Sequence, residues 1–123
     1  MTKLLNLILL CALSFLTVGS ITVDKPTTGD ECLVYIPETI SPNGDGFNDW
    51  FLLEPTCEVK DYTLRIYTSS KRLVFESYTT EELWDGSESG SPLPQGHYSW
   101  ELRLVKKENG DVINEKGKIT LIR

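Results

Sequence analysis

The chain has 123 residues, and 18 Asp and Glu outnumber 12 Lys and Arg, which gives a formal net charge of −6 at pH 7. An acidic protein is repelled by the phosphates of nucleic acid and by an anionic bilayer, so the charge argues against both as partners. About a hundred residues beyond an N-terminal leader suit one small domain with a single hydrophobic core.

The N-terminal residues are typical of a secretory signal peptide. Lys3 provides the positive start, residues 4–18 form an apolar run, and small residues up to Ser20 predict cleavage after that position. Loss of Lys3 takes the formal net charge from −6 to −7. The surroundings of Cys11 are not those of a lipidation site, and no later segment is apolar enough to cross a bilayer. We therefore expect residues 1–20 to be removed and the mature protein to be exported without an anchor of its own.

The mature chain is predicted to form one all-β domain. Residues 21–31 are polar, contain Pro and Gly, and predict a flexible lead, which leaves residues 32–123 for the fold. Strand-like apolar segments follow in order at 33–36, 50–53, 62–67, 73–76, 98–104 and 118–123. Asn109-Gly110 is typical of a two-residue hairpin turn. Turn signals at steady spacing and no helical period predict an Ig-like antiparallel β-sandwich of about seven strands.

An acidic loop, residues 41–49, follows the first strand with the sequence Ser-Pro-Asn-Gly-Asp-Gly-Phe-Asn-Asp. Its oxygen-bearing side chains are Asn43, Asp45, Asn48 and Asp49. Carboxylates and amides on a glycine-rich turn suit Ca²⁺, although the spacing is not that of an EF-hand. Asn and Asp beside Gly are equally common in tight turns, where they bond the local backbone. These four residues are thus either calcium ligands or turn residues.

Two cysteines remain after signal cleavage, Cys32 and Cys57. In an exported small domain such a pair predicts one disulfide, which closes a loop around the acidic segment. A metal site is the poorer alternative, since His97 is the only histidine and lies far along the chain. A catalytic cysteine is also the poorer alternative, because it too would need a partner residue nearby.

The remaining aromatic residues and the histidine favour a non-catalytic protein. We expect Trp84 and Trp100 in the core of the sandwich and not on a sugar-stacking platform. Trp50 follows the acidic loop directly, where partial exposure is an alternative, and it is expected in the core rather than in a ligand-binding site. His97 is expected on the surface without an acid or base partner, and no nucleophile–base set appears elsewhere. We therefore expect no enzymatic activity.

Several motifs in a fixed order resemble a known family. They are Ser41-Pro42-Asn43-Gly44-Asp45-Gly46-Phe47-Asn48-Asp49, Leu64-Arg65-Ile66-Tyr67, Leu73-Val74-Phe75-Glu76-Ser77, Trp84-Asp85-Gly86, Pro92-Leu93-Pro94-Gln95-Gly96-His97-Tyr98 and Ile119-Thr120-Leu121-Ile122-Arg123. This series is similar to the type B C-terminal sorting domain of the type IX secretion system, the gliding-motility-associated C-terminal domain of Bacteroidota. The likeness runs from about Cys32 to Arg123.

The resemblance implies an Ig-like sandwich that the outer-membrane translocon reads and that keeps cargo at the cell surface or releases it. It also implies that the closing strand acts as the sorting signal; its residues are Lys118, Ile119, Thr120, Leu121, Ile122 and Arg123. One departure is Thr68-Ser69-Ser70-Lys71, which stands where family members carry an Asn-Arg-Trp-Gly turn. A role tied to that aromatic turn is therefore not expected here.

Only the leader and a short lead precede the domain in this sequence, so we expect a stand-alone sorting-domain protein. The first hypothesis is a small accessory subunit, associated with secretion or gliding, that binds a translocon component or a partner β-barrel protein at the outer membrane. The alternative is a free surface or secreted module for adhesion or interaction, stabilised by Ca²⁺. Neither hypothesis involves nucleic acid or insertion into a membrane after signal cleavage.

Overall fold

The computed structural model describes residues 31–123 together with Gly19, and all of its regular structure is β. Nine strands follow in chain order: β1 (Val34–Tyr35), β2 (Thr39–Ile40), β3 (Glu54–Pro55), β4 (Val59–Tyr67), β5 (Leu73–Ser77), β6 (Ser87–Glu88), β7 (Ser91–Pro92), β8 (Gly96–Lys106) and β9 (Val112–Leu121). The predicted signal peptide and nearly all of the predicted lead lie outside the described residues. None of the described residues forms a helix with the length and apolarity needed to cross a bilayer.

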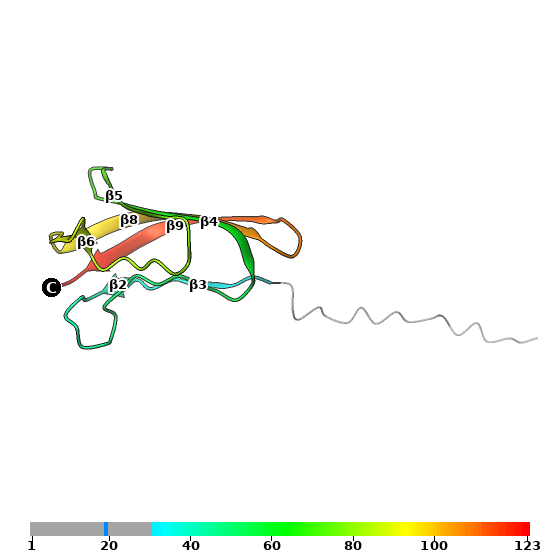
Figure 1. Ribbon diagram of the computed structural model, residues 1–123, viewed down its shortest axis with the longest axis horizontal. Coiled ribbons are helices and arrows are strands. Elements are labelled where there is room, and N and C mark those ends of the chain that lie inside the picture. The colour runs from blue at the N-terminus through cyan, green and yellow to red at the C-terminus, as the bar shows by residue number, and fades with distance from the viewer. Residues whose placement is uncertain (1–18, 20–30) are drawn as a thin grey trace, which may run out of the picture.

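The main sheet contains five strands in the order β2-β9-β8-β4-β5. Its long strands pair antiparallel, and β8 pairs with β9 over the full length of β9, from Val105↔Val112 to Gly96↔Leu121. The short strand β2 pairs parallel with the end of β9, with Thr39 opposite Thr120. A second layer beneath this sheet contains the β1–β3 pair and the irregular chain around Phe51 and Trp84, which form an isolated bridge (Figure 1).

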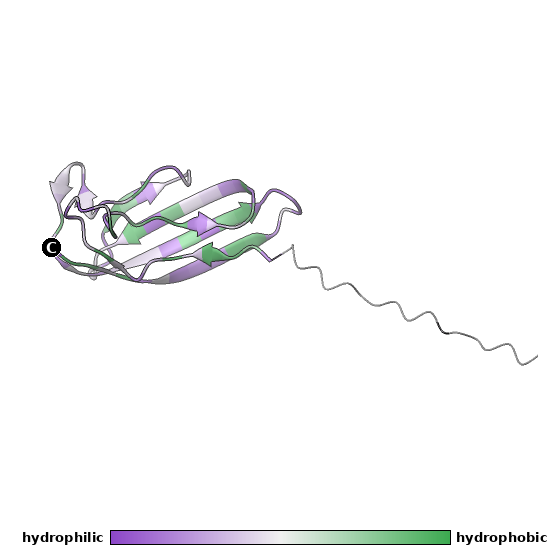
Figure 2. Ribbon diagram, turned by 90° about the horizontal axis from the view of Figure 1, so that it is seen from below, coloured by the Kyte–Doolittle hydropathy of each residue, from purple (hydrophilic) through white to green (hydrophobic). Residues whose placement is uncertain are grey.

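Alternation along the long strands builds the core between the two layers. Figure 2 shows hydrophobic and hydrophilic residues alternating along these strands, as a sheet with one buried face requires. The main sheet contributes Tyr62, Leu64, Ile66, Trp100, Leu102, Leu104, Ile119 and Leu121, and the second layer contributes Phe51, Leu53, Trp84 and Leu93. Burial raises the pKa of Tyr62 to about 12. The core shared by the two layers confirms the predicted sandwich, and the burial of Trp84 and Trp100 confirms the core positions predicted for them.

Some local predictions were wrong. Residues 50–53 form no strand, apart from the bridge at Phe51, because the chain here turns out of the acidic loop and does not run beside a partner strand. The link between β8 and β9 is five residues long, not two, and is closed by the N–H of Lys106 donating to the Asp111 carbonyl at 2.8 Å. The closing strand begins at Val112, and Ile122 and Arg123 lie beyond its end. The strand count is nine because five of them have only two residues.

The two ends of the sandwich are distinct. Figure 1 shows residue 31 leaving the fold at one end, where the β8–β9 loop also lies. The last residue lies at the opposite end, together with β6 and the acidic loop. The acidic loop, the turns around β6 and the end of β9 therefore lie at the end of the sandwich opposite residue 31.

Candidate functional site

The acidic loop folds around the carboxylate of Asp49. Its Oδ1 accepts hydrogen bonds from the N–H of Asn43 at 3.0 Å and of Gly44 at 2.9 Å, and its Oδ2 accepts one from Gly46 at 2.7 Å. Asp49 is only 4% exposed. Since these N–H groups lack partners in a strand or helix, the carboxylate satisfies donors that would otherwise be unpaired.

Two smaller turns complete the loop. The side-chain oxygen of Asn43 accepts from the N–H of Asp45 at 3.0 Å, and that of Asp45 accepts from Phe47 at 2.8 Å. Both are Asx turns, in which a side chain imitates the backbone acceptor of a tight turn. Asn48 adopts the left-handed conformation, φ 52°, which Asn tolerates better than most residues. The turn interpretation of the four predicted residues thus describes how they are arranged.

Electrostatics within the loop favour an ionised Asp49. Burial opposes ionisation and by itself raises the pKa of Asp49, but the N–H groups of Gly46, Asn43 and Gly44 outweigh it and hold the pKa below its ordinary value. The same donors direct their positive ends at both carboxylate oxygens, where a cation would have to approach. Across residues 31–123, no three His, Cys, Asp or Glu side chains gather as a metal site. Calcium binding therefore stays a prediction.

Two aromatic side chains are exposed, one in the loop and one directly after it. Phe47 is 76% exposed and Trp50 is 51% exposed. The prediction of Trp50 as a core residue was wrong, because Phe51 takes the inward position, with 1% exposure, and its neighbour faces the other way. Phe47 was not singled out from the sequence, although a large apolar residue inside an Asn/Asp/Gly turn was the available signal.

The closing strand is part of the core and is fastened to the neighbouring turns. Ile119 and Leu121 are buried, while Lys118 and Ile122 are exposed. Arg123 donates from Nη2 to the Gly86 carbonyl at 2.7 Å and from Nε to the Leu93 carbonyl at 2.8 Å. This terminal guanidinium joins two turns that the sequence presented as separate motifs. Their spatial relation was not predicted.

These turns carry their own internal bonds. The indole N–H of Trp84 donates to the Ser87 carbonyl at 3.0 Å, and the N–H of Leu93 donates to the Gly86 carbonyl at 2.9 Å. The phenol of Tyr98 donates to the Pro94 carbonyl at 2.6 Å. A surface groove of about 560 Å³ lies between the turns and the acidic loop; its lining includes Asp49, Trp50, Asp85, Ser87, Pro92 and Arg123. The acidic loop, the turns and the end of β9 form one continuous end of the molecule.

The predicted disulfide lies outside this cluster. Cys32 and Cys57 are bonded, with Cα atoms 5.1 Å apart, which confirms the pairing. The N–H of Thr56 donates to the Leu33 carbonyl at 2.8 Å, beside the bridge. The disulfide therefore ties the start of the domain to the chain just before β4.

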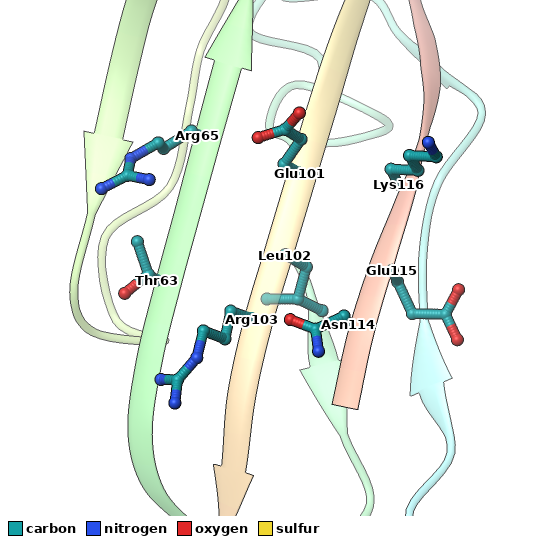
Figure 3. Close-up of a pocket in the computed structure, with 8 residues that line it drawn as sticks. All are labelled: Thr63, Arg65, Glu101, Leu102, Arg103, Asn114, Glu115 and Lys116. Atoms are coloured by element: carbon teal, nitrogen blue, oxygen red, sulfur yellow. The ribbon is translucent and has the colours of Figure 1, made fainter. Parts of the chain in front are cut away.

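A second surface recess, of about 530 Å³, lies on the main sheet (Figure 3), and eight residues of β4, β8 and β9 line it. Charges there are balanced across neighbouring strands, with Glu101 opposite both Arg65 and Lys116 in the strand register. Arg65 also pairs with Glu76 at 2.6 Å, and this hydrogen bond and charge raise the pKa of Arg65 and lower that of Glu76. These are the features of a solvated sheet face and supply no converging site.

His97 is exposed, as predicted, and its Nδ1 lies 3.1 Å from the Thr120 hydroxyl. Both side chains belong to adjacent strands, at the register position His97↔Thr120. This contact gives the imidazole a neighbour on the sheet surface and does not place it against an acid or a nucleophile.

Among solved structures, the fold resembles CopC from Methylosinus trichosporium OB3b, with a TM-score of 0.53 and 15% identity over 74% of this chain and 93% of that chain. It also matches PorZ, a surface component of the type IX secretion system of Porphyromonas gingivalis, with a TM-score of 0.44 and 17% identity. That match covers 82% of this chain and 13% of PorZ. The CopC likeness supports the β-sandwich and nothing further.

The comparison with curated proteins found no match. Residues 34–121, by contrast, match the CHU_C Type IX secretion signal domain. The match covers most of the chain and includes the acidic loop, the turns and β9, and the chain belongs to the type IX secretion signal domain family.

Proposed function

We propose that this protein is exported through the outer-membrane translocon of type IX secretion and then acts as a small, non-catalytic subunit at the cell surface. It binds a translocon component or a partner β-barrel protein there. Membership of the signal-domain family implies export across the cell envelope. The binding role and the location at the outer membrane are the further steps of the proposal.

One observation carries the proposal: the family match has the same bounds as the fold. It begins at Val34, the first residue of β1, and ends at Leu121, the last residue of β9. A signal with these bounds is a folded sandwich and not a linear tail. This supports a receptor that recognises a surface of the folded domain.

The contacts of the usual catalytic residue types support a binding role. Cys32 and Cys57 are consumed in the disulfide, and His97 contacts only the Thr120 hydroxyl among the hydrogen bonds found in residues 31–123. The buried carboxylate of Asp49 is ionised and bonded to backbone N–H groups, so it is a poor general base. Calcium is not part of this proposal, and its binding to the acidic loop stays a separate prediction.

The test is export of a reporter by the full chain. A compact reporter inserted after Lys25 leaves every residue of the protein in place, and the fusion is expressed in a bacterium with type IX secretion and in its translocon-deficient sibling. We expect the reporter to be open to added protease on intact cells of the first strain and periplasmic in the second. Washing of isolated outer membranes with high salt should leave the protein bound.

Folding must be checked in the same samples. An intact disulfide and resistance to limited proteolysis serve that purpose. A folded fusion that stays periplasmic in both strains would contradict export by this route. A folded fusion found only in the culture supernatant would contradict the subunit role while leaving export intact.

A further inference from the structure

The acidic loop is ordered by its own polar groups, while the large apolar side chains in it and directly after it are exposed to solvent. Five hydrogen bonds join its side chains to its backbone, from Asp49, Asn43 and Asp45. Phe47 and Trp50 nevertheless remain exposed. Ordering a loop costs conformational entropy, and a loop that is already ordered binds a partner without that cost. The arrangement is that of a pre-formed binding loop with aromatic anchors.

The base of this loop lies next to the end of β9. The N–H of Ser41 donates to the Asn48 carbonyl at 2.7 Å and closes the base of the loop. The N–H of Ile122 donates to the carbonyl of Ile40, the preceding residue, at 2.9 Å. Ile122 is itself 46% exposed. One hydrogen bond thus links the exposed residue after β9 to Ile40, the residue that precedes the loop.

Charge around these side chains is negative. Asp45 and Asp85 are exposed, and neither takes part in the four ion pairs found within residues 31–123. Arg123, which lines the same groove, directs its guanidinium at the Gly86 and Leu93 carbonyls. Phe47 and Trp50 therefore have an acidic rim, which consists of Asp45 in the same loop and Asp85 in the groove that Trp50 lines. A complementary partner offers an apolar recess flanked by Lys or Arg.

The charge also distinguishes among possible occupants. A second copy of this chain would bring an acidic rim against an acidic rim, and an anionic bilayer would repel the carboxylates. A protein recess with a basic rim suffers neither repulsion. It would bury the aromatic rings at its centre, where such residues contribute most to affinity.

Building on the proposed function, we propose that Phe47 and Trp50, here called the docking patch, insert into an apolar, basic-rimmed recess of the outer-membrane protein that receives the folded domain. The docking patch lies at the end of the sandwich where the sequence motifs meet. The recognised feature is therefore a composite surface, because Trp50 lines one groove together with Asp85 and Arg123, which lie far later in the chain.

The test compares Phe47→Ser, Trp50→Ser and the double variant of the full chain with Tyr78→Ser. Tyr78 is a matched control, since it is 65% exposed and lines a recess with Val59 and Tyr62, close to the opposite end of the sheet. Two measurements are needed: the fraction of protein open to protease on intact cells with type IX secretion, and binding of purified mature chain to washed outer membranes. Protein-free vesicles of the same lipids serve as the lipid control.

We expect the double variant to melt like the wild type but to bind outer membranes roughly tenfold or more weakly, and its surface fraction to fall. Tyr78→Ser should match the wild type in both measurements. Asp45→Asn with Asp85→Asn keeps the acceptor oxygens and removes the charges. This charge variant should bind outer membranes more weakly than the wild type at low salt and equally well at high salt.

The outcomes separate the two proposals. If the wild type is exported and a folded double variant binds and is exported equally well, the docking patch is wrong and the proposed function stands. If the folded wild type itself stays periplasmic, the proposed function fails first. Tight binding to protein-free vesicles, or a dimer in ultracentrifugation that the double variant abolishes, would also overturn the inference, because the occupant would then be lipid or a second copy.

Discussion

Gly86 and Leu121 lie so close together that position 86 has no room for a side chain. A Cβ on Gly86 would stand 2.7 Å from Cδ1 of Leu121. Gly86 also has φ +76°, in the left-handed region that side chains disfavour. The turn after Trp84 is thereby pressed against the last residue of β9, and the two sequence motifs form one packed unit.

Gly86→Ala is expected to destabilise the protein by about 1–3 kcal/mol, because it adds a steric clash to an unfavourable backbone conformation. Gly90→Ala is the matched control: its φ is +81°, but nothing lies within 4 Å of its Cβ position. Urea unfolding of both variants measures the difference in the free energy of unfolding. Equal losses would show that the contact with Leu121 contributes nothing.

Arg123→Ala should lower the free energy of unfolding by about 1 kcal/mol, because two carbonyls lose a charged donor. Arg123→Lys should recover little of this, since one ammonium group cannot reproduce the planar fork that reaches both Gly86 and Leu93. Arg103→Lys, at the exposed ion pair with Asp61, is the control and should change little. If Arg123→Lys instead unfolds like the wild type, a positive charge alone is enough to fasten this end of the chain.

Asp49→Asn should lower the melting temperature at neutral pH, since the amide presents a donor to one of the three N–H groups that the carboxylate accepts. The pKa of Asp49 is lower in the folded protein than its ordinary 3.8, so its stabilisation is present above pH 3.8 and is lost as the pH falls through the folded value. The gap between wild type and variant should therefore narrow in acid. A gap that stays constant from pH 7 to pH 2 would rule out this linkage.

The two interpretations of the acidic loop predict different responses to calcium: a loop that is only a turn should keep its melting temperature unchanged, and a calcium site should be stabilised. The carboxylate oxygens of Asp49 face backbone donors, and Asn43 and Asp45 are engaged in Asx turns. A ligand that binds only the native state raises the melting temperature by mass action. Calorimetry in millimolar calcium and in chelator therefore decides the matter, and a rise with calcium but not with magnesium would establish a calcium site.

Removal of the disulfide by Cys32→Ser with Cys57→Ser is expected to cost about 3 kcal/mol, because the bridge closes a loop of 25 residues in the unfolded chain. Urea unfolding of the oxidised wild type and of the double variant measures this difference in the free energy of unfolding. Cys32→Ser alone leaves a free thiol and should be no more stable than the double variant. A loss well under 1 kcal/mol would mean that the bridge hardly constrains the unfolded state.

The long strands and their buried faces follow from the sequence alone. Alternation at Tyr62, Leu64 and Ile66 predicts which side chains point inward, because a strand repeats every two residues and one face of the sheet must be buried. The disulfide can also be predicted from the sequence, because an exported chain with two cysteines after signal cleavage allows only one pairing. The family was also recognisable, because its motifs occur in a fixed order along the chain.

Other features are settled only by the tertiary structure. Local sequence does not show that Phe51 enters the core while Trp50 faces water, because both are large and apolar and their direction depends on how the acidic loop leaves Asp49. Nor does it show that Arg123 reaches Gly86 and Leu93, since these residues meet only when β9 packs against the turns. Periodicity and turn chemistry are local and can be read along the chain, whereas the groove beside Trp50 is lined by residues from separate segments that only the folded sandwich brings together.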